Sequence, residues 1–146
     1  MDLQYVLYIN APPERVWRAL CDGQPIAAAM PGVELRSTFE PGSDYAYVGR
    51  KPDGSEVSYV YGKVLASEPN RRMEMTYRTG DQPFESRVVY ALEPVGKGYT
   101  KLTATQDRFE PGDPNYEQNL DGWPKLLSNL KSFIETGEVM NYYAQG

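Results

Sequence analysis

The stretch DGWPKLLSNLKSFIETG, residues 121–137, restricts the fold of this chain more than any other segment. Its apolar residues recur at intervals of three and four and therefore form one stripe of an α-helix. They are Trp123, Leu126, Leu127, Leu130, Phe133 and Ile134. About fifteen residues at ~1.5 Å rise each make a rod of roughly 22 Å, which can cross several strands of a sheet. We therefore expect a terminal helix that covers one face of a sheet.

The start of this helix is open to two interpretations. Asp121 suits an N-cap, Pro124 would then lie in the first turn, and Gly137 suits the left-handed residue that ends a helix. Alternatively, residues 116–120 are helical too, and Gly122 with Pro124 marks a kink inside one longer helix, because a proline cannot donate to the carbonyl one turn back. The sequence does not decide between the two.

Upstream of this helix the apolar period changes. From residue 33 to residue 108 it is two, and turn residues appear at regular intervals, as is typical of an antiparallel meander. The predicted strands are residues 33–39, 45–49, 56–67, 72–78, 84–93 and 99–108. A further strand is predicted at residues 3–10, followed by two short helices at residues 13–21 and 25–30.

This order of elements predicts an α+β fold, in which a curved antiparallel sheet of about seven strands buries one face under the long terminal helix. We expect one domain, residues 1–138, followed by a tail at residues 139–146 that has no apolar period and is loosely held. Because a strongly curved sheet cannot follow a straight helix along its whole length, we also expect a cavity between the two.

The composition argues against several partners. The net charge is −5 and no basic run is present, which gives little support for binding the phosphates of nucleic acids. No apolar run approaches the ~20 residues of a membrane helix and the N-terminus does not resemble a signal peptide, so we expect no membrane association and a cytoplasmic location. The single cysteine, Cys21, agrees with a reducing compartment and is interpreted as a structural thiol.

The chain contains no histidine. Ser-His-Asp and Cys-His nucleophiles and His-ligated metal sites are therefore excluded, because each needs an imidazole. The acidic loop with Asp107, Glu110 and Asp113 lacks the regular ligand spacing of a calcium loop and is interpreted as a solvated turn. We expect no cofactor and no metal.

Three blocks of sequence resemble one known superfamily. They are YVLYINAPPERVWRAL near the start, VYGKVLASEPNRRMEMTY in the middle and GWPKLLSNLKSFIETG near the end. They are similar to the START-like, helix-grip superfamily, also called SRPBCC, and most of all to its branch of activator of Hsp90 ATPase homologues. The resemblance spans roughly residues 5–137 and implies a seven-stranded antiparallel sheet that grips the C-terminal helix around a hydrophobic pocket. It implies no single activity, because members bind lipids, hormones or polyketides and some act as cyclases.

Strand parity predicts which side chains face this pocket, since apolar residues that alternate with charged ones should point inward. The predicted ligand-binding residues are Val60, Met75, Tyr77, Val88, Tyr90, Leu102, Trp123, Leu127 and Leu130. For any one of them, an ordinary place in a dry core is the competing interpretation. Methionines and tyrosines on one face nevertheless suit a pocket of mixed polarity. No residue is predicted to be catalytic.

The remaining tyrosines are open to two interpretations. Tyr59 and Tyr61 share the parity of Lys63, which places them on the outer face of the sheet as cross-strand pairs or in the contact of a homodimer. The alternative is that they stack on an aromatic ligand together with Tyr45 and Tyr47.

Three functions stand as hypotheses. The favoured one is binding of a small hydrophobic or aromatic molecule between sheet and helix. The second is an enzyme that uses the same pocket, as cyclase-like relatives do, for which Glu56, Arg87 and Gln106 would qualify only if strand parity were reversed. The third is a cofactor of an Hsp90-type chaperone, which only the name of the branch suggests.

Overall fold

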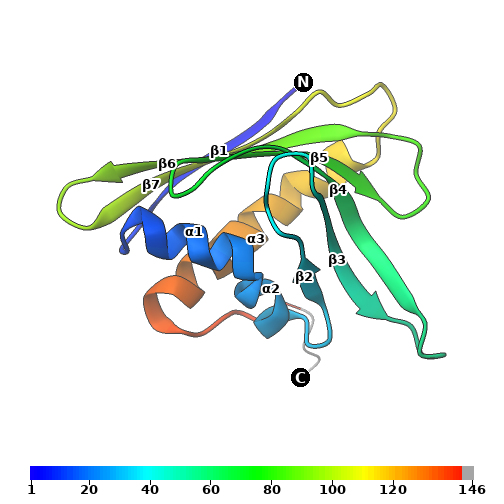
Figure 1. Cartoon of the computed structure of the whole chain (residues 1–146), viewed down its shortest axis with the longest axis horizontal. Helices are drawn as coiled ribbons and strands as arrows, with labels where there is room; N and C mark the ends of the chain where they lie inside the picture. The colour runs from blue at the N-terminus through cyan, green and yellow to red at the C-terminus, as the bar shows by residue number, and fades with distance from the viewer. Residues whose placement is uncertain (143–146) are drawn as a thin grey trace.

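The computed structural model describes residues 1–142 of the chain (Figure 1). In this range the strands are β1 (Leu3–Ile9), β2 (Glu34–Arg36), β3 (Asp44–Arg50), β4 (Glu56–Glu68), β5 (Arg72–Thr79), β6 (Ser86–Val95) and β7 (Tyr99–Asp107). The helices are α1 (Pro13–Asp22), α2 (Gln24–Ala29) and α3 (Asn115–Thr136). All strands join one antiparallel sheet in the order β1-β7-β6-β5-β4-β3-β2.

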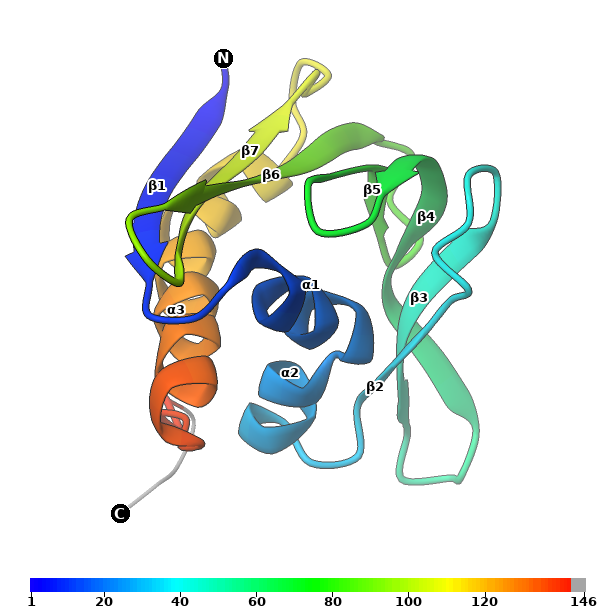
Figure 2. The same cartoon turned by 60° about the vertical axis from the view of Figure 1, so that its left-hand side comes forward.

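The sheet bends around the helices, as Figure 2 shows. Helix α3 runs along the β1 side of the concave face, and α1 and α2 lie between α3 and the strands β2 and β3. The curved seven-stranded sheet, the long terminal helix and the two short helices confirm the predicted helix-grip fold.

The long helix is continuous from Asn115 to Thr136, so the prediction that Asp121 caps its start is wrong. Pro124 lies inside it and removes one backbone donor. The carbonyl that this donor would have reached belongs to Leu120, and the hydroxyl of Tyr5 on β1 donates to it at 3.3 Å. The sheet thus supplies the hydrogen bond that the proline removes, and the helix passes through without a break.

The core follows the alternation expected from the sequence. Its inner-face residues on β5, β6 and β7 are Met73, Met75, Val88, Tyr90, Leu92, Leu102 and Ala104. Their neighbours on the outer face are mostly polar, with Val89 and Ala91 as exceptions. There Arg87 donates to Asp107 at 2.7 and 2.9 Å and to Glu74 at 3.3 Å, across three adjacent strands.

Strand β2 is shorter than expected and strand β6 is shifted along the chain. Strand β2 covers only Glu34–Arg36, because the chain then turns at Phe39, whose φ of 57° is left-handed. The side chain of Ser37 accepts a hydrogen bond from the Phe39 N–H at 3.0 Å and holds this turn. Strand β6 begins at Ser86 rather than at residue 84.

Strand β4 carries an extra residue opposite β3. Tyr47 is opposite Val60, whereas Val48 is opposite Ser58, so Tyr59 has no partner in the register. Such a β-bulge changes the direction of the side chains around it. The prediction that Tyr59 shares the outward parity of Lys63 does not take account of this bulge.

The tail is better held than expected. The buried side chain of Asn129 on α3 donates to the Met140 carbonyl at 3.0 Å and accepts from the Met140 N–H at 2.7 Å. The hydroxyl of Tyr142 donates to the carbonyl of Lys125 at 3.3 Å. Residues 138–142 therefore run back along α3, and the prediction of a loose tail is wrong for them. Residues 143–146 lie outside the described part of the chain.

Candidate functional site

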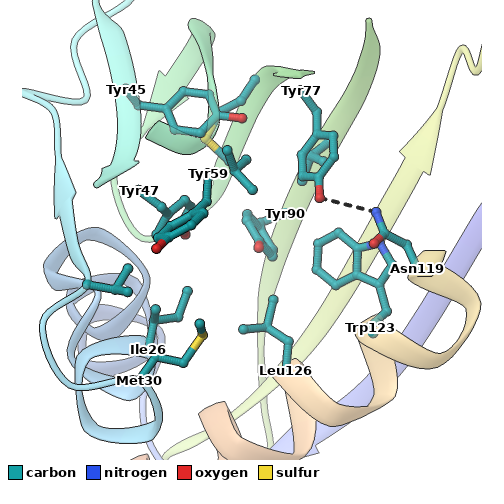
Figure 3. A pocket seen from close by; sticks show the side chains of 15 residues that line it. Ile26, Met30, Tyr45, Tyr47, Tyr59, Tyr77, Tyr90, Asn119, Trp123 and Leu126 are labelled. Atoms are coloured by element: carbon teal, nitrogen blue, oxygen red, sulfur yellow. Dashed lines mark hydrogen bonds between the residues drawn. The ribbon is translucent and has the colours of Figure 1, made fainter. Parts of the chain in front are cut away.

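A cavity of about 240 Å³ lies between α3, α2 and the inner faces of β3 to β6 (Figure 3). Its lining is mostly apolar and aromatic: Ile26, Met30, Val33, Tyr45, Tyr47, Tyr59, Val60, Met75, Tyr77, Val88, Tyr90, Asn119, Gly122, Trp123 and Leu126. Met30 is 42% exposed and Tyr59 is 44% exposed, so these two side chains lie at the mouth of the cavity. The curvature of the sheet leaves this space open because α3 packs against the β1 side of the sheet.

The wall formed by β3 depends on a glycine in the neighbouring strand. The hydroxyl of Tyr45 donates to the carbonyl of Thr76 on β5 at 2.5 Å. Strand β4 lies between β3 and β5, and its residue opposite Tyr45 is Gly62. A Cβ atom at Gly62 would clash with the carbonyl oxygen of Thr76, so a side chain here would displace the group to which Tyr45 donates. Tyr47 packs against the Tyr45 ring edge to face, with ring centroids 6.4 Å apart.

A second glycine makes room for Tyr59. A Cβ atom at Gly49 on β3 would lie 2.6 Å from the Tyr59 ring, so the ring covers this glycine. Figure 3 shows Tyr59 on the cavity side of β4. Tyr61, by contrast, donates its hydroxyl to the carbonyl of Gly80 at 2.8 Å and does not line the cavity. The sequence predicted one outward direction for both tyrosines, and this is wrong for Tyr59 because of the bulge.

A buried polar network closes the end of the cavity at the start of α3. Gln106 on β7 is fully buried and accepts hydrogen bonds from Trp123 Nε1 and Asn119 Nδ2, both at 2.8 Å. Its own amide donates to Ser86 Oγ at 2.9 Å. Asn119 also donates to the hydroxyl of Tyr77 at 3.3 Å, as Figure 3 shows. The network fixes the rotamers of Trp123 and Tyr77, which form part of the cavity wall.

Three hydroxyl groups in the wall have no partner among residues 1–142. They belong to Tyr47 on β3, Tyr59 on β4 and Tyr90 on β6. Among the described residues that are not exposed, Asp113 Oδ2 is the only side-chain oxygen that is both enclosed and unpaired. The hydroxyls of Tyr47 and Tyr90 therefore face open space, which at their position is the cavity.

Burial keeps four tyrosines of the cavity wall neutral. It raises the pKa of Tyr90 and of Tyr45 well above the usual value, and it raises the pKa of Tyr47 as well. Repulsion from the neighbouring tyrosines adds to each shift, and Tyr47 is the largest such contributor at Tyr90. Burial also raises the pKa of Tyr77, against the opposing hydrogen bond from Asn119. These four side chains are hydrogen-bonding groups and not bases near neutral pH.

The predicted ligand-binding residues divide into two groups. Those that line the cavity are Val60, Met75, Tyr77, Val88, Tyr90 and Trp123. Leu127 and Leu130 do not line it, because they lie one and two turns further along α3 and face a small void of about 20 Å³ next to α1 and α2. Leu102 is fully buried beside Leu7 and Leu92 in the packed part of the sheet, away from the cavity. A role in binding stays a prediction for the six lining residues. It has no support in the structure for Leu102, Leu127 and Leu130.

Several lining residues were absent from the prediction. Asn119 and Gly122 were missed because the sequence did not decide whether the helix begins before Asp121. Ile26 and Met30 were missed because nothing in the sequence shows that α2 packs across the mouth. Tyr45 and Tyr47 were recoverable, since they alternate along one strand and were considered as ligand contacts.

Among the polar candidates considered for catalysis, Gln106 points inward with no reversal of parity. It lies two residues after Ala104 on the same face, so the expectation that it would point outward was wrong. Glu56 forms an exposed ion pair with Arg36, and Arg87 lies on the outer face with Asp107, so neither reaches the cavity.

Other chemistry finds little support in residues 1–142. No group of three or more His, Cys, Asp or Glu side chains there could hold a metal ion. Burial, with a smaller contribution from Asp22, raises the pKa of the Cys21 thiol to about 11, which keeps it protonated and unreactive. None of the helices in this range is long and apolar enough to cross a membrane.

Comparison with solved structures shows the same fold in bacterial proteins. The protein MLL2253 from Mesorhizobium loti superposes with a TM-score of 0.73 at 24% identity, over 95% of this chain and 100% of that one. The Aha1 dimer from Colwellia psychrerythraea gives a TM-score of 0.73 at 18% identity, over 94% and 98% of the two chains. CalU16 from Micromonospora echinospora gives 0.71 at 22% identity, over 93% and 77%.

Sequence comparison gives the family. No sequence among the curated proteins is similar enough to count as a match. The model of one family, described as activator of Hsp90 ATPase homolog 1-like protein, matches residues 10–135, which include strands β2 to β7 and nearly all of α3. The chain therefore belongs to the activator of Hsp90 ATPase homolog 1-like family.

Proposed function

We propose that this protein binds a small, largely apolar molecule, with one or two aromatic rings, in the cavity between α3 and the sheet. The observation that carries the proposal is an apolar space of about 240 Å³ in an otherwise packed core, with a mouth at Met30 and Tyr59. A cavity of 150 Å³ is enough for benzene, so this one has room for two fused rings.

The energetics of the cavity support an occupant. Apolar side chains that line an open pocket stay in contact with water, and removing apolar surface from water stabilises by roughly 25 cal/mol per Å². An apolar ligand would recover part of this free energy through contact with Val60, Met75 and Trp123.

Binding is better supported than catalysis. Among the described residues that line the cavity there is no Asp, Glu, Lys or Arg, and the tyrosines are held neutral. No group in the wall is therefore placed to remove a proton from a ligand near pH 7. A role as an Hsp90 cofactor stays a prediction that rests on the family name, and a stimulated ATPase rate of Hsp90 on addition of this chain would support it.

The experiment uses the methionine methyl groups as reporters. Met75 and Met30 line the cavity, whereas Met73 lies in the packed core and Met140 in the tail. In the protein labelled with ¹³C-methyl methionine, titration with 2-isopropenylnaphthalene should shift the methyl resonances of the two lining methionines. Those of Met73, Met140 and the exposed Met1 should stay in place. A single saturable site is expected.

A matched pair of variants tests the location. Val60→Trp fills the cavity and should abolish these shifts, whereas Val6→Trp adds the same ring to the half-exposed outer face of β1 and should leave binding within about twofold. Binding that survives in Val60→Trp, or the absence of binding in the wild type, would refute the proposed function.

A further inference from the structure

Two of the unpaired hydroxyls belong to residues that line the same two spaces. Tyr47 and Tyr90 both line the large cavity, and both also line the small void of about 20 Å³ beside it. Figure 3 shows the Tyr47 and Tyr90 rings, from two different strands, above Ile26 and Leu126. Neither hydroxyl has a hydrogen-bond partner among residues 1–142. The third unpaired hydroxyl, that of Tyr59, belongs to a side chain at the mouth, where water can reach it.

An unpaired phenol facing an apolar cavity needs an acceptor. A polar group that gives up water without a new partner costs about 1–3 kcal/mol. Few acceptors for Tyr47 and Tyr90 are available in the wall, because its side chains are otherwise aliphatic, aromatic or engaged in the Asn119 network. Either an occupant of the cavity supplies the acceptor, or a single water does so from the small void, which is large enough for one.

The wall also restricts the charge of an occupant. A buried carboxylate needs a cationic partner, and no lysine or arginine is present among the described lining residues. The chain as a whole carries a net charge of −5, which opposes an anion further. A buried ammonium group would likewise lack a carboxylate in the wall.

We propose that the ligand is an uncharged aromatic molecule with a carbonyl-type oxygen, and that the hydroxyls of Tyr47 and Tyr90 both donate to this oxygen. A carbonyl oxygen has two lone pairs and can accept from two donors at once. This inference rests on the proposed function. It adds the polarity of the ligand and names the two residues that recognise its polar group.

The test uses three probes of nearly equal shape, namely 2-acetonaphthone, 2-isopropenylnaphthalene and 2-naphthoate. Each carries the same naphthalene ring, and the substituent is a ketone, a hydrocarbon or a carboxylate. Dissociation constants are measured from the Met75 and Met30 methyl shifts. The ketone should bind at least as tightly as the hydrocarbon, although it is the better hydrated of the two, and the carboxylate should bind most weakly.

The variants are Tyr47→Phe and Tyr90→Phe, with Tyr61→Phe as the matched control. Each of the first two substitutions should weaken binding of the ketone by about three- to tenfold, which corresponds to the loss of one hydrogen bond. The dissociation constant of the hydrocarbon should change by less than about twofold. Tyr61→Phe also removes one hydroxyl, but its hydroxyl bonds to Gly80 away from the cavity, so it should change neither constant.

The outcomes separate the two proposals. If the hydrocarbon binds but the ketone is insensitive to both tyrosine substitutions, water serves these hydroxyls and the inference is wrong while the proposed function stands. Tightest binding of the carboxylate would also overturn the inference. If none of the three probes shifts the Met75 methyl, the proposed function itself fails.

Discussion

Replacing Gln106 by leucine should destabilise the protein far more than its small change in volume suggests. The side chain is fully buried and makes three hydrogen bonds, at 2.8, 2.8 and 2.9 Å. Leucine would leave two buried groups without their present partner, the indole N–H of Trp123 and the hydroxyl of Ser86. The two residues are only 5% and 3% exposed. At about 1–3 kcal/mol for each stranded group, less a gain from the added apolar side chain, we expect a loss of about 2–4 kcal/mol.

Urea unfolding followed by circular dichroism measures this loss, and a thermal scan should show a fall in Tm of roughly 5–15 °C. Gln4→Leu is the matched control, because Gln4 on β1 is exposed and makes a single 3.3 Å bond to Thr105; it should change stability by less than about 0.5 kcal/mol. In a Trp123→Phe background the cost of Gln106→Leu should fall by about 1 kcal/mol or more, since one stranded donor is gone. A Gln106→Leu variant as stable as the wild type would refute the role assigned to the network.

Three further results are expected. Gly49→Ala should destabilise the protein by about 1–3 kcal/mol in urea unfolding, because the added methyl group clashes with the Tyr59 ring. Replacing Tyr59 by leucine as well should relieve most of this loss. An unchanged cost of Gly49→Ala in the double variant would contradict the contact. Asn129→Ala should release the tail, so that hydrogen exchange of its backbone amides becomes roughly tenfold faster while that of the sheet is unchanged. Arg87 lowers the pKa of Asp107 below its unfolded value, so the pair stabilises the fold above about pH 4 and this stability is lost as the pH falls further. In Asp107→Asn the free energy of unfolding should therefore fall less steeply below about pH 4. The same pH dependence in both proteins would show that the pair does not contribute to stability.

Most of the fold could be predicted because its signals are local. Period two in the strands and period 3.6 in the last helix depend only on near neighbours, and turn residues mark the boundaries. The same parity argument correctly placed Met75 and Tyr77 on the inner face of β5. It would also have placed Gln106 inward, two residues after Ala104, although Gln106 was grouped with the outward-facing Glu56 and Arg87.

The cavity was harder to predict because its boundaries depend on the whole sheet. The bulge that brings Tyr59 inward is a property of the pairing between β3 and β4, and the sequence of neither strand alone predicts it. The position of α3 across the sheet decides that Trp123 meets the cavity and Leu127 does not. Neither the offset of a helix nor the curvature of a sheet can be derived from a periodic pattern alone.

The turn of α3 that contains Pro124 has a consequence for how the protein could accept ligands of different length. One backbone hydrogen bond is missing there, and the substitute from Tyr5 is long, at 3.3 Å. The same turn borders the ligand space through Gly122 and Trp123. A helix bends most easily where its ladder is interrupted, but the segment before the proline is tied to β5 and β7 by the hydrogen bonds of Asn115 to Thr79 and of Asn119 to Gln106. A longer guest could therefore widen the space at this turn only by breaking these hydrogen bonds.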